Sequence, residues 1–140
     1  MIRPAVPDLS YLAGFFDGEG SLMLIRNKER RPRPTIAVTN TDLLVLGHYQ
    51  NLFGGSINPL IDTRNRDRPM QPLNQWRASG PTAYGAVKAM QPYLRVKFEQ
   101  AKFWLDAFEE LTDGPRIRPR DLEREAWLVT TLSAMKRQPS

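Results

Sequence analysis

Cysteine is absent from this sequence, and histidine occurs only once, at His48. Without cysteine the chain cannot form disulfides, thiolate-bound zinc sites or iron–sulfur clusters, and it cannot use a cysteine nucleophile. A single histidine also excludes a metal site built from several histidines of one chain. No apolar run approaches the roughly 18–20 residues that a membrane-spanning helix needs, and residues 1–10 lack the apolar stretch of a secretory signal. We therefore expect an intracellular protein that is not secreted and has no membrane partner.

The length and charge of the chain indicate one folded domain with a polyanionic partner. The 140 residues can bury a hydrophobic core without disulfide or metal support, which predicts a single domain over 1–140. Twenty lysines and arginines outnumber fifteen aspartates and glutamates, giving a net charge of +5. Such a surplus favours a polyanionic partner, although it carries no information about the fold.

Hydrophobic periodicity predicts secondary-structure elements in the order α-β-β-α-β-β-α-α-α, which indicates an α+β fold. We expect the core of the domain over about 8–112 and a helical extension over about 113–137. Residues 27–34 are interpreted as a basic connection between two strands of a hairpin. The predicted helices cover 8–17, 42–53, 81–91, 94–111 and 119–136, and the predicted strands cover 21–26, 35–39, 56–61 and 73–78.

The most informative segment is Leu12–Gly20, with the sequence LAGFFDGEG. It predicts a helix that ends in two closely spaced carboxylates, Asp17 and Glu19, among glycines that allow a sharp turn. Carboxylates at a helix C-terminus are unfavourable by about 0.3–1 kcal/mol each, and a bound cation would offset this cost. Hard divalent cations such as Mg²⁺ bind carboxylate and carbonyl oxygens. The alternative interpretation is an ordinary helix end with a solvated acidic turn.

This segment resembles the signature of the LAGLIDADG homing endonucleases, with Phe15-Phe16 in place of an aliphatic pair and Glu19 in place of the second aspartate. Two further features extend the resemblance over about 9–112. The segment Gln91–Lys97, QPYLRVK, is similar to a family segment that carries an active-site lysine. Thr39-Asn40 ends a predicted strand where the family places a polar residue. The resemblance implies the family's fold, an antiparallel sheet that forms a DNA-binding saddle with helices packed behind it.

The resemblance also implies a catalytic centre. Glu19 occupies the position of the family's metal ligand, and the backbone carbonyl of Gly18 is expected to touch the same metal. Lys97 is expected to stabilise charge on the phosphate or to polarise the attacking water, and Asn40 is expected to hold a metal-bound water. Asp17 is expected to cap or brace the helix ends. The implied cofactor is Mg²⁺, with Mn²⁺ or Ca²⁺ able to replace it in binding.

One signature supplies one metal-binding carboxylate, whereas cutting both DNA strands requires two such centres. Because no second signature occurs in the 140 residues, we expect a homodimer with the two signature helices packed at its two-fold axis. The DNA target should then be approximately two-fold symmetric as well. Small residues four apart allow two helices to approach closely, and the expected interface residues are Ala13, Gly14, Asp17 and Gly18.

Alternation along the predicted strands identifies the face that should bind double-stranded DNA. A two-stranded ribbon fits the major groove, where arginine can form two hydrogen bonds with guanine. Taken alone, each arginine is also compatible with a solvated surface position or a phosphate contact. The first hairpin contributes Arg31, Arg33, Thr35, Ala37 and Thr39, and the second contributes Asn58, Gln75 and Arg77 together with the loop residues Arg64, Arg66 and Arg68.

The function expected from these features is that of an intron-encoded homing endonuclease, which makes site-specific, metal-dependent double-strand breaks in a long, pseudo-palindromic DNA target. The first alternative is a maturase on the same fold, which would bind intron RNA and assist its splicing. The second is a DNA-binding relative without catalysis. Glu19 and Lys97 argue against the second alternative but do not separate the endonuclease from the maturase.

Overall fold

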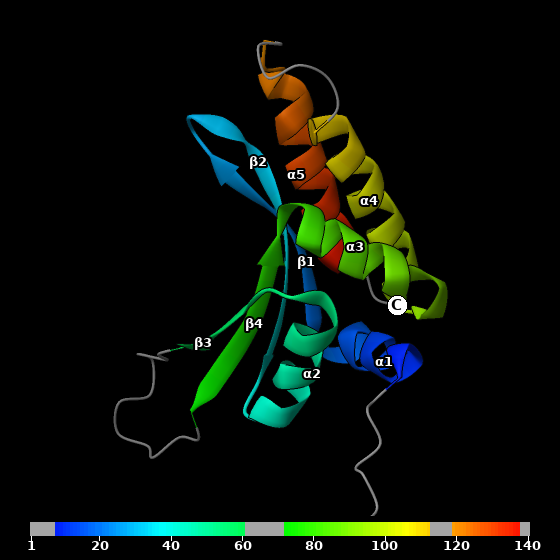
Figure 1. Cartoon of the computed structure of the whole chain (residues 1–140). Coiled ribbons are helices and arrows are strands. Elements are labelled where there is room, and N and C mark those ends of the chain that lie inside the picture. The colour runs from blue at the N-terminus through cyan, green and yellow to red at the C-terminus, as the bar shows by residue number, and fades with distance from the viewer. Residues whose placement is uncertain (1–7, 61–71, 113–118, 138–140) are drawn as a thin grey trace, which may run out of the picture.

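A four-stranded antiparallel sheet with helices on one side forms the fold (Figure 1). The computed structural model describes residues 8–60, 72–112 and 119–137. The order of elements confirms the predicted α+β fold. Within the described residues, no helix is both long enough and apolar enough to cross a membrane. The sheet has the order β1-β2-β4-β3, and the elements are α1 (Leu9–Glu19), β1 (Gly20–Asn27), β2 (Arg30–Asn40), α2 (Leu43–Phe53), β3 (Ser56–Leu60), β4 (Leu73–Ser79), α3 (Gly80–Met90), the 3₁₀ turn η1 (Gln91–Tyr93), α4 (Phe98–Thr112) and α5 (Leu122–Arg137).

Alternate strand residues form the core between the sheet and the helices. Leu22, Ile36 and Trp76 are fully buried. The indole of Trp76 stacks on Tyr49 of α2 with ring centroids 4.9 Å apart. Its N–H donates to the carbonyl of Gly54 at 2.8 Å, so a large apolar ring is buried with its polar atom satisfied. Because successive side chains of a strand point to opposite faces, the neighbours of these residues point to the face without helices.

The first hairpin is longer than the sequence predicted. β2 begins at Arg30 rather than at residue 35, so the predicted connection over 27–34 is mostly strand. Pro32 and Pro34 lack an N–H and would be unfavourable in the centre of a sheet. However, β4 pairs with β2 only from Thr35 onward, so both prolines lie where one edge of β2 is open, and such positions tolerate proline. The outer part of the hairpin is therefore a two-stranded ribbon that extends beyond the four-stranded sheet.

Three helix boundaries also differ from the predictions, and one of them is the start of α5 at Leu122 rather than at residue 119. α1 continues through Gly18 and ends at Glu19, where the Gly20 N–H donates to the Phe16 carbonyl. A Cβ at residue 20 would overlap the Phe16 ring, so Gly20 rather than Gly18 marks the end of the helix. α4 begins at Phe98 rather than at residue 94, because η1 and a short connection precede it. The connection brings the start of α4 against the end of α1.

Candidate active site and nucleic-acid interface

Asp17 joins the last turn of α1 to the start of α4. Its Oδ2 accepts the backbone N–H groups of Arg95 and Val96 at 2.8 and 3.2 Å, and its Oδ1 accepts that of Lys97 at 2.9 Å. These donors directly precede Phe98, the first residue of α4. Backbone N–H groups of a connection have no partner within a helix or strand, and the Asp17 carboxylate satisfies these three. Asp17 thus joins the end of α1 to the segment that leads into α4.

Lys97 lies beside the signature, as its place in the sequence predicted. Its Nζ donates to the backbone carbonyl of Asp17 at 2.6 Å. Burial lowers the pKa of the Lys97 ammonium, while the nearby charges of Asp17 and Glu19 act in the opposite direction. The ammonium group is thus held between the two acids of the signature. Residues 78 to 80 positions apart in the chain meet at this point.

Glu19 is the last residue of α1, and its side chain is exposed next to Lys97. Gly18, one residue earlier, is exposed as well. A glutamate carboxylate and main-chain carbonyls are oxygen ligands of the kind that Mg²⁺ prefers, so these two residues fit a divalent ion. Within the described part of the chain, no group of three or more His, Cys, Asp or Glu side chains could hold a metal. Among these residues, the Glu19 carboxylate and the Gly18 carbonyl are the candidate metal ligands at the end of α1.

Asn40 ends β2 at the same end of the sheet as Glu19. The strand pairing places Gly20 opposite Val38, and Asn40 follows two residues later. Its Oδ1 accepts the N–H of Asp42 at 2.9 Å, and Asp42 in turn caps α2 through the N–H of Leu44. Asn40 thus stabilises the turn into α2, a role that the sequence did not reveal.

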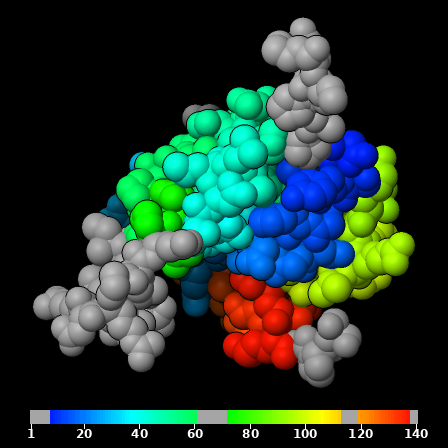
Figure 2. Space-filling view, turned by 90° about the horizontal axis from the view of Figure 1, so that it is seen from below, coloured from blue at the N-terminus to red at the C-terminus, as the bar shows by residue number. Residues whose placement is uncertain are grey.

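Lys136 is a basic residue near this site that sequence reasoning missed. Burial and the charge of Lys97 lower its pKa, so the two ammonium groups lie near each other. Figure 2 shows the end of α5, in red, on the same face of the molecule as α1, in blue. The two lysines are 39 residues apart, and no local pattern links them. Only the packing of α5 beside β1 brings them together.

The sheet face without helices carries most of the residues expected to bind DNA. The register aligns Ala37 with Arg77 and Thr39 with Gln75 across β2 and β4, and Asn58 of β3 pairs with Gln75. Gln75 donates from Nε2 to the Thr39 hydroxyl at 3.3 Å. The predicted alternation is therefore present in the fold.

The members of this face differ in exposure. Arg33, Arg77 and Asn58 are exposed, whereas Thr35 and Ala37 are buried at 0% and 2% exposure. The Thr35 hydroxyl bonds within the protein, to the Ser79 hydroxyl and the Arg33 carbonyl, at 3.0 and 3.1 Å. In this conformation Thr35 and Ala37 support the face rather than offering atoms to a ligand.

A cationic hollow of about 570 Å³ opens on this face where β4 ends and β2 continues. Three guanidinium-bearing side chains line it, from Arg26, Arg33 and Arg77. Hydroxyl and amide groups complete the polar part of its wall, including those of Ser79 and Asn27. Arginine bonds phosphate oxygens and guanine edges in the same planar geometry, so the hollow suits a nucleic-acid strand.

Arg31 lies elsewhere than the alternation predicted. It lines a separate hollow with Glu110 of α4 and Arg124 of α5. The pairing changes from Ile25 opposite Arg33 to Asn27 opposite Arg30, and this irregularity interrupts the alternation on which the prediction rested. The predicted loop residues Arg64, Arg66 and Arg68 lie outside the described residues.

The expected interface residues of α1 divide between its two sides. Ala13 is fully buried in the core of its own chain, which contradicts its placement on an outer surface. Gly14 and Gly18 are exposed, and a Cβ built on either would meet no atom within 4 Å. Asp17 is half-buried at the junction with α4. The outer strip of α1 is therefore Gly14 and Gly18, with Tyr11 exposed one turn earlier.

Comparison with known proteins finds solved structures with a similar fold. No protein-family model and no curated protein sequence matches the chain. Among solved structures, the homing endonuclease I-CvuI in complex with its target has a TM-score of 0.72 at 22% identity, with 94% of this chain and 83% of that chain covered. The archaeal intron-encoded homing endonuclease I-Vdi141I, complexed with DNA, has a TM-score of 0.73 at 17% identity, with 94% and 86% covered.

This is the LAGLIDADG homing-endonuclease fold. The LAGLIDADG homing endonuclease I-GzeII, in complex with its DNA target, matches at a TM-score of 0.61 and 19% identity. The match covers 95% of this chain but only 45% of that one. The likeness confirms the fold that the signature at 12–20 implied, and it adds that a chain of about twice this length can carry the same unit.

Proposed function

We propose that this protein is a site-specific endonuclease that makes metal-dependent double-strand breaks in a long, pseudo-palindromic DNA target, and that an intron encodes it. The observation that carries the proposal is the convergence of Glu19 and Lys97 at one end of a sheet whose open face is lined with arginines. A carboxylate beside an ammonium group, next to a surface for polyanions, suits hydrolysis of a phosphodiester. The I-CvuI and I-Vdi141I structures, both complexes of homing endonucleases, support the same activity.

The residues have separable roles in this chemistry. Glu19 and the Gly18 carbonyl would hold Mg²⁺, which when bound polarises a phosphoryl oxygen and activates water. Lys97, fixed by its bond to the Asp17 carbonyl, is placed to stabilise the negative charge that develops on the phosphate. The two I-CvuI structures contained calcium and magnesium respectively, which supports a divalent cofactor here.

A second copy of the chain would complete the site. One chain offers Glu19 and no larger acidic cluster within the described residues, so two cuts require two chains. The exposed strip of Gly14 and Gly18 is the surface on which two α1 helices could cross closely. The match covers 83% of the I-CvuI chain but only 45% of the I-GzeII chain. This protein therefore corresponds to about half of the longer chain, which supports an assembly of two copies.

The test begins with a plasmid library that carries randomised two-fold symmetric inserts. Incubation with the purified protein and Mg²⁺ should linearise a subset of plasmids, and sequencing should give one preferred target. EDTA should abolish cutting, and Ca²⁺ should support binding to that target. Absence of any selected target, together with tight binding of intron RNA, would overturn the endonuclease and favour the maturase.

The Glu19→Gln variant tests the assigned ligand. The amide keeps the shape of the side chain but loses the charge that holds the metal, so cleavage should fall by about 10³-fold, corresponding to several kcal/mol of charge stabilisation. Binding to the selected target should change little. Glu123→Gln, on the exposed first turn of α5, is the matched control and should cut normally. Normal cutting by Glu19→Gln would remove Glu19 from the site.

A further inference from the structure

The outer ribbon of the first hairpin has little support from the sheet. β2 pairs with β4 only over Thr35–Asn40, so 30–34 has β1 as its strand partner and no other within the described residues. A two-stranded ribbon alone is only marginally stable in water. The ribbon nevertheless carries Arg33 and borders the cationic hollow. Something outside the sheet must therefore fix its direction.

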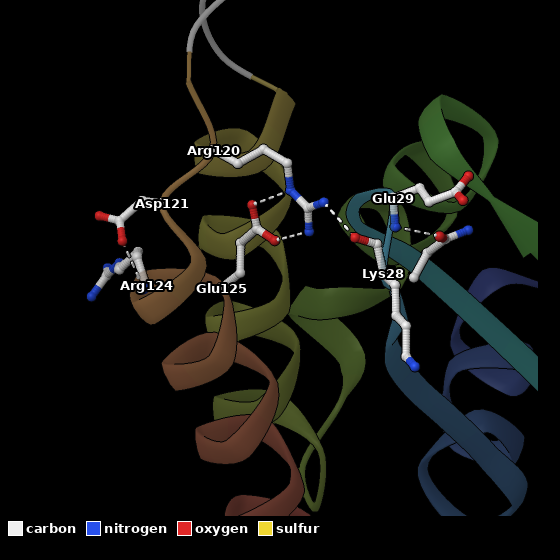
Figure 3. A network of polar contacts seen from close by, with 7 residues as sticks. Lys28, Glu29, Arg120, Asp121, Arg124 and Glu125 are labelled. Atoms are coloured by element: carbon white, nitrogen blue, oxygen red, sulfur yellow. Dashed lines mark hydrogen bonds and ion pairs between the residues drawn. The ribbon is translucent and has the colours of Figure 1, made fainter.

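Arg120 and Glu125 connect this ribbon to the start of α5 (Figure 3). The Nη1 of Arg120 donates to the backbone carbonyl of Lys28, in the hairpin turn, at 3.0 Å. The Nε and Nη2 of the same guanidinium donate to both carboxylate oxygens of Glu125, at 3.2 and 2.6 Å. One planar group thus reaches the hairpin and the helix at once. We call these three residues the hairpin clamp.

The carboxylate of the clamp is buried, and its guanidinium is partly exposed. The side chain of Glu125 is 7% exposed and that of Arg120 is 26% exposed. A hollow of about 550 Å³, lined by Lys28 and Pro32 on one side and Leu122 on the other, lies between the hairpin and α5. Pro32 and Pro34 of the ribbon are buried, so packing supports its strands, and the hydrogen bonds of the guanidinium hold its turn at Lys28. A shielded ion pair with good geometry holds direction better than an exposed one.

We propose that Arg120 and Glu125 are positioning residues that aim the hairpin ribbon into the DNA groove and so set base discrimination at the outer positions of each half-site. This inference rests on the proposed function. Base-edge hydrogen bonds require accurate placement, whereas phosphate attraction acts over longer distances. Loss of the clamp should therefore weaken discrimination more than overall binding.

Arg124, four residues after Arg120 and in the first turn of α5, provides a matched control. It also forms a two-point pair with a carboxylate, donating to Glu110 of α4 at 2.9 and 2.8 Å. These side chains are 47% and 41% exposed, and their bonds join α5 to α4. Arg124→Ala removes one guanidinium near the start of α5 and leaves the hydrogen bonds of the clamp intact.

The experiment compares wild type with Arg120→Ala, Arg120→Lys and Arg124→Ala. Hydrogen exchange of the amides in 25–33 reports the mobility of the ribbon without DNA. Affinity for the selected target, and for targets with one inner or one outer base pair changed, reports discrimination. We expect Arg120→Ala to speed ribbon exchange and to reduce outer discrimination about tenfold, with inner discrimination unchanged. Arg120→Lys should rescue only part of the effect, because an ammonium group cannot replace the planar fork.

A double variant separates the loss of the clamp from unfolding caused by an unpaired buried charge. Arg120→Ala leaves the Glu125 carboxylate buried without its partner, so the double variant Arg120→Ala/Glu125→Gln removes both charges together. It should fold and show the same loss of outer discrimination. Faster exchange with unchanged discrimination would overturn the inference, as would equal effects of Arg124→Ala. If wild type selects no DNA target, the proposed function fails and this inference fails with it. If wild type selects a target but the clamp variants discriminate normally, only the inference fails.

Discussion

Two junctions lie near opposite ends of the first hairpin and are built in different ways; the inner one joins α1, which leads into β1, to the segment before α4. At the inner end, the Asp17 carboxylate accepts three backbone N–H groups just before α4. At the outer end, the hairpin clamp joins the turn to α5 through a guanidinium and a carboxylate. The inner junction needs one charged side chain and a segment of backbone. The outer junction needs two charged side chains, Arg120 and Glu125, placed so that the guanidinium reaches both the carboxylate and the hairpin turn.

Under the proposed function, this difference separates catalysis from recognition. The inner junction places Lys97 near Glu19, and the proposed chemistry requires that geometry in every turnover. The outer junction is proposed to aim side chains at a DNA sequence, so its geometry should decide which sequence is bound. Substitutions at the inner junction should therefore reduce cleavage, and substitutions at the outer junction should reduce base discrimination. The following predictions test that separation, from the largest expected effect to the smallest.

Gly14→Leu should have the largest effect, because the inner end is proposed to be shared between two chains. The added side chain meets no atom of its own chain within 4 Å, so the protomer should still fold. Overpacking costs typically about 1–3 kcal/mol, and a two-fold interface carries the change twice. We expect loss of the dimer and of double-strand cleavage, measured by sedimentation equilibrium and plasmid linearisation. The control is Gly85→Leu, because Gly85 lies on α3 and has the same open surroundings. If the Gly14→Leu protein remains dimeric and active, the interface lies elsewhere.

Asp17→Asn should come next, and it should impair both folding and chemistry. One oxygen becomes an NH₂ group, which cannot accept a backbone N–H, so one or two of the three hydrogen bonds are lost. At about 1.5–3 kcal/mol for each bond to a charged group, the free energy of unfolding should fall by about 2–4 kcal/mol. Urea unfolding and cleavage rates measure the two effects, with the exposed Asp106→Asn as control. Unchanged stability would contradict the role of Asp17 as the inner junction.

Arg33→Ala should affect recognition alone. If its guanidinium bonds a guanine edge, the substitution should cost about 1–3 kcal/mol at one position of each half-site and relax the preference there. The free energy of unfolding should be unchanged, because the side chain is exposed. Competition binding with single-base variants of the target measures this effect. An equal loss of affinity for all sequences would instead assign Arg33 to phosphate contact.

The exposed pair of Arg124 and Glu110 should show the smallest effect, and it should depend on pH. The hydrogen bond from Arg124 lowers the pKa of the Glu110 carboxyl from its usual 4.5. A lowered folded-state pKa stabilises the protein above pH 4.5, and this contribution is lost as the pH falls through the lowered value. Urea unfolding of wild type and Arg124→Ala between pH 3 and 7 should show a small difference that shrinks below pH 4.5. A difference that grows on acidification would contradict this assignment.

The inner end could be predicted from the sequence because its signals are local. The segment at 12–20 identified Glu19 and Asp17, and QPYLRVK at 91–97 identified Lys97. The strand alternation likewise placed Arg77, Gln75 and Thr39 on one face, since a buried residue such as Trp76 fixes the parity of its neighbours. Each inference needed only a spacing within one element or a short segment.

The outer end could not be predicted, because its signals are spread over the chain. Arg120 meets the Lys28 carbonyl across 92 positions, and a backbone carbonyl leaves no trace in the sequence. The irregularity near Asn27 shifted the register, so alternation gave the wrong side for Arg31. The sequence also left open whether α5 extends a dimer or covers the core. In the structure α5 packs on α4 and beside the hairpin.

The alternation of buried and exposed residues along β4 has a consequence for how such a protein can change. Along β4, Trp76 and Ala78 are buried, whereas Arg77 between them is exposed on the open face. Residues that specify the fold and residues proposed to contact a target thus occupy separate positions of the same strand. A substitution at Arg77 changes the chemistry of the open face without opening a cavity below it. Under the proposed function, this strand could therefore acquire new targets one residue at a time while its folded state persists.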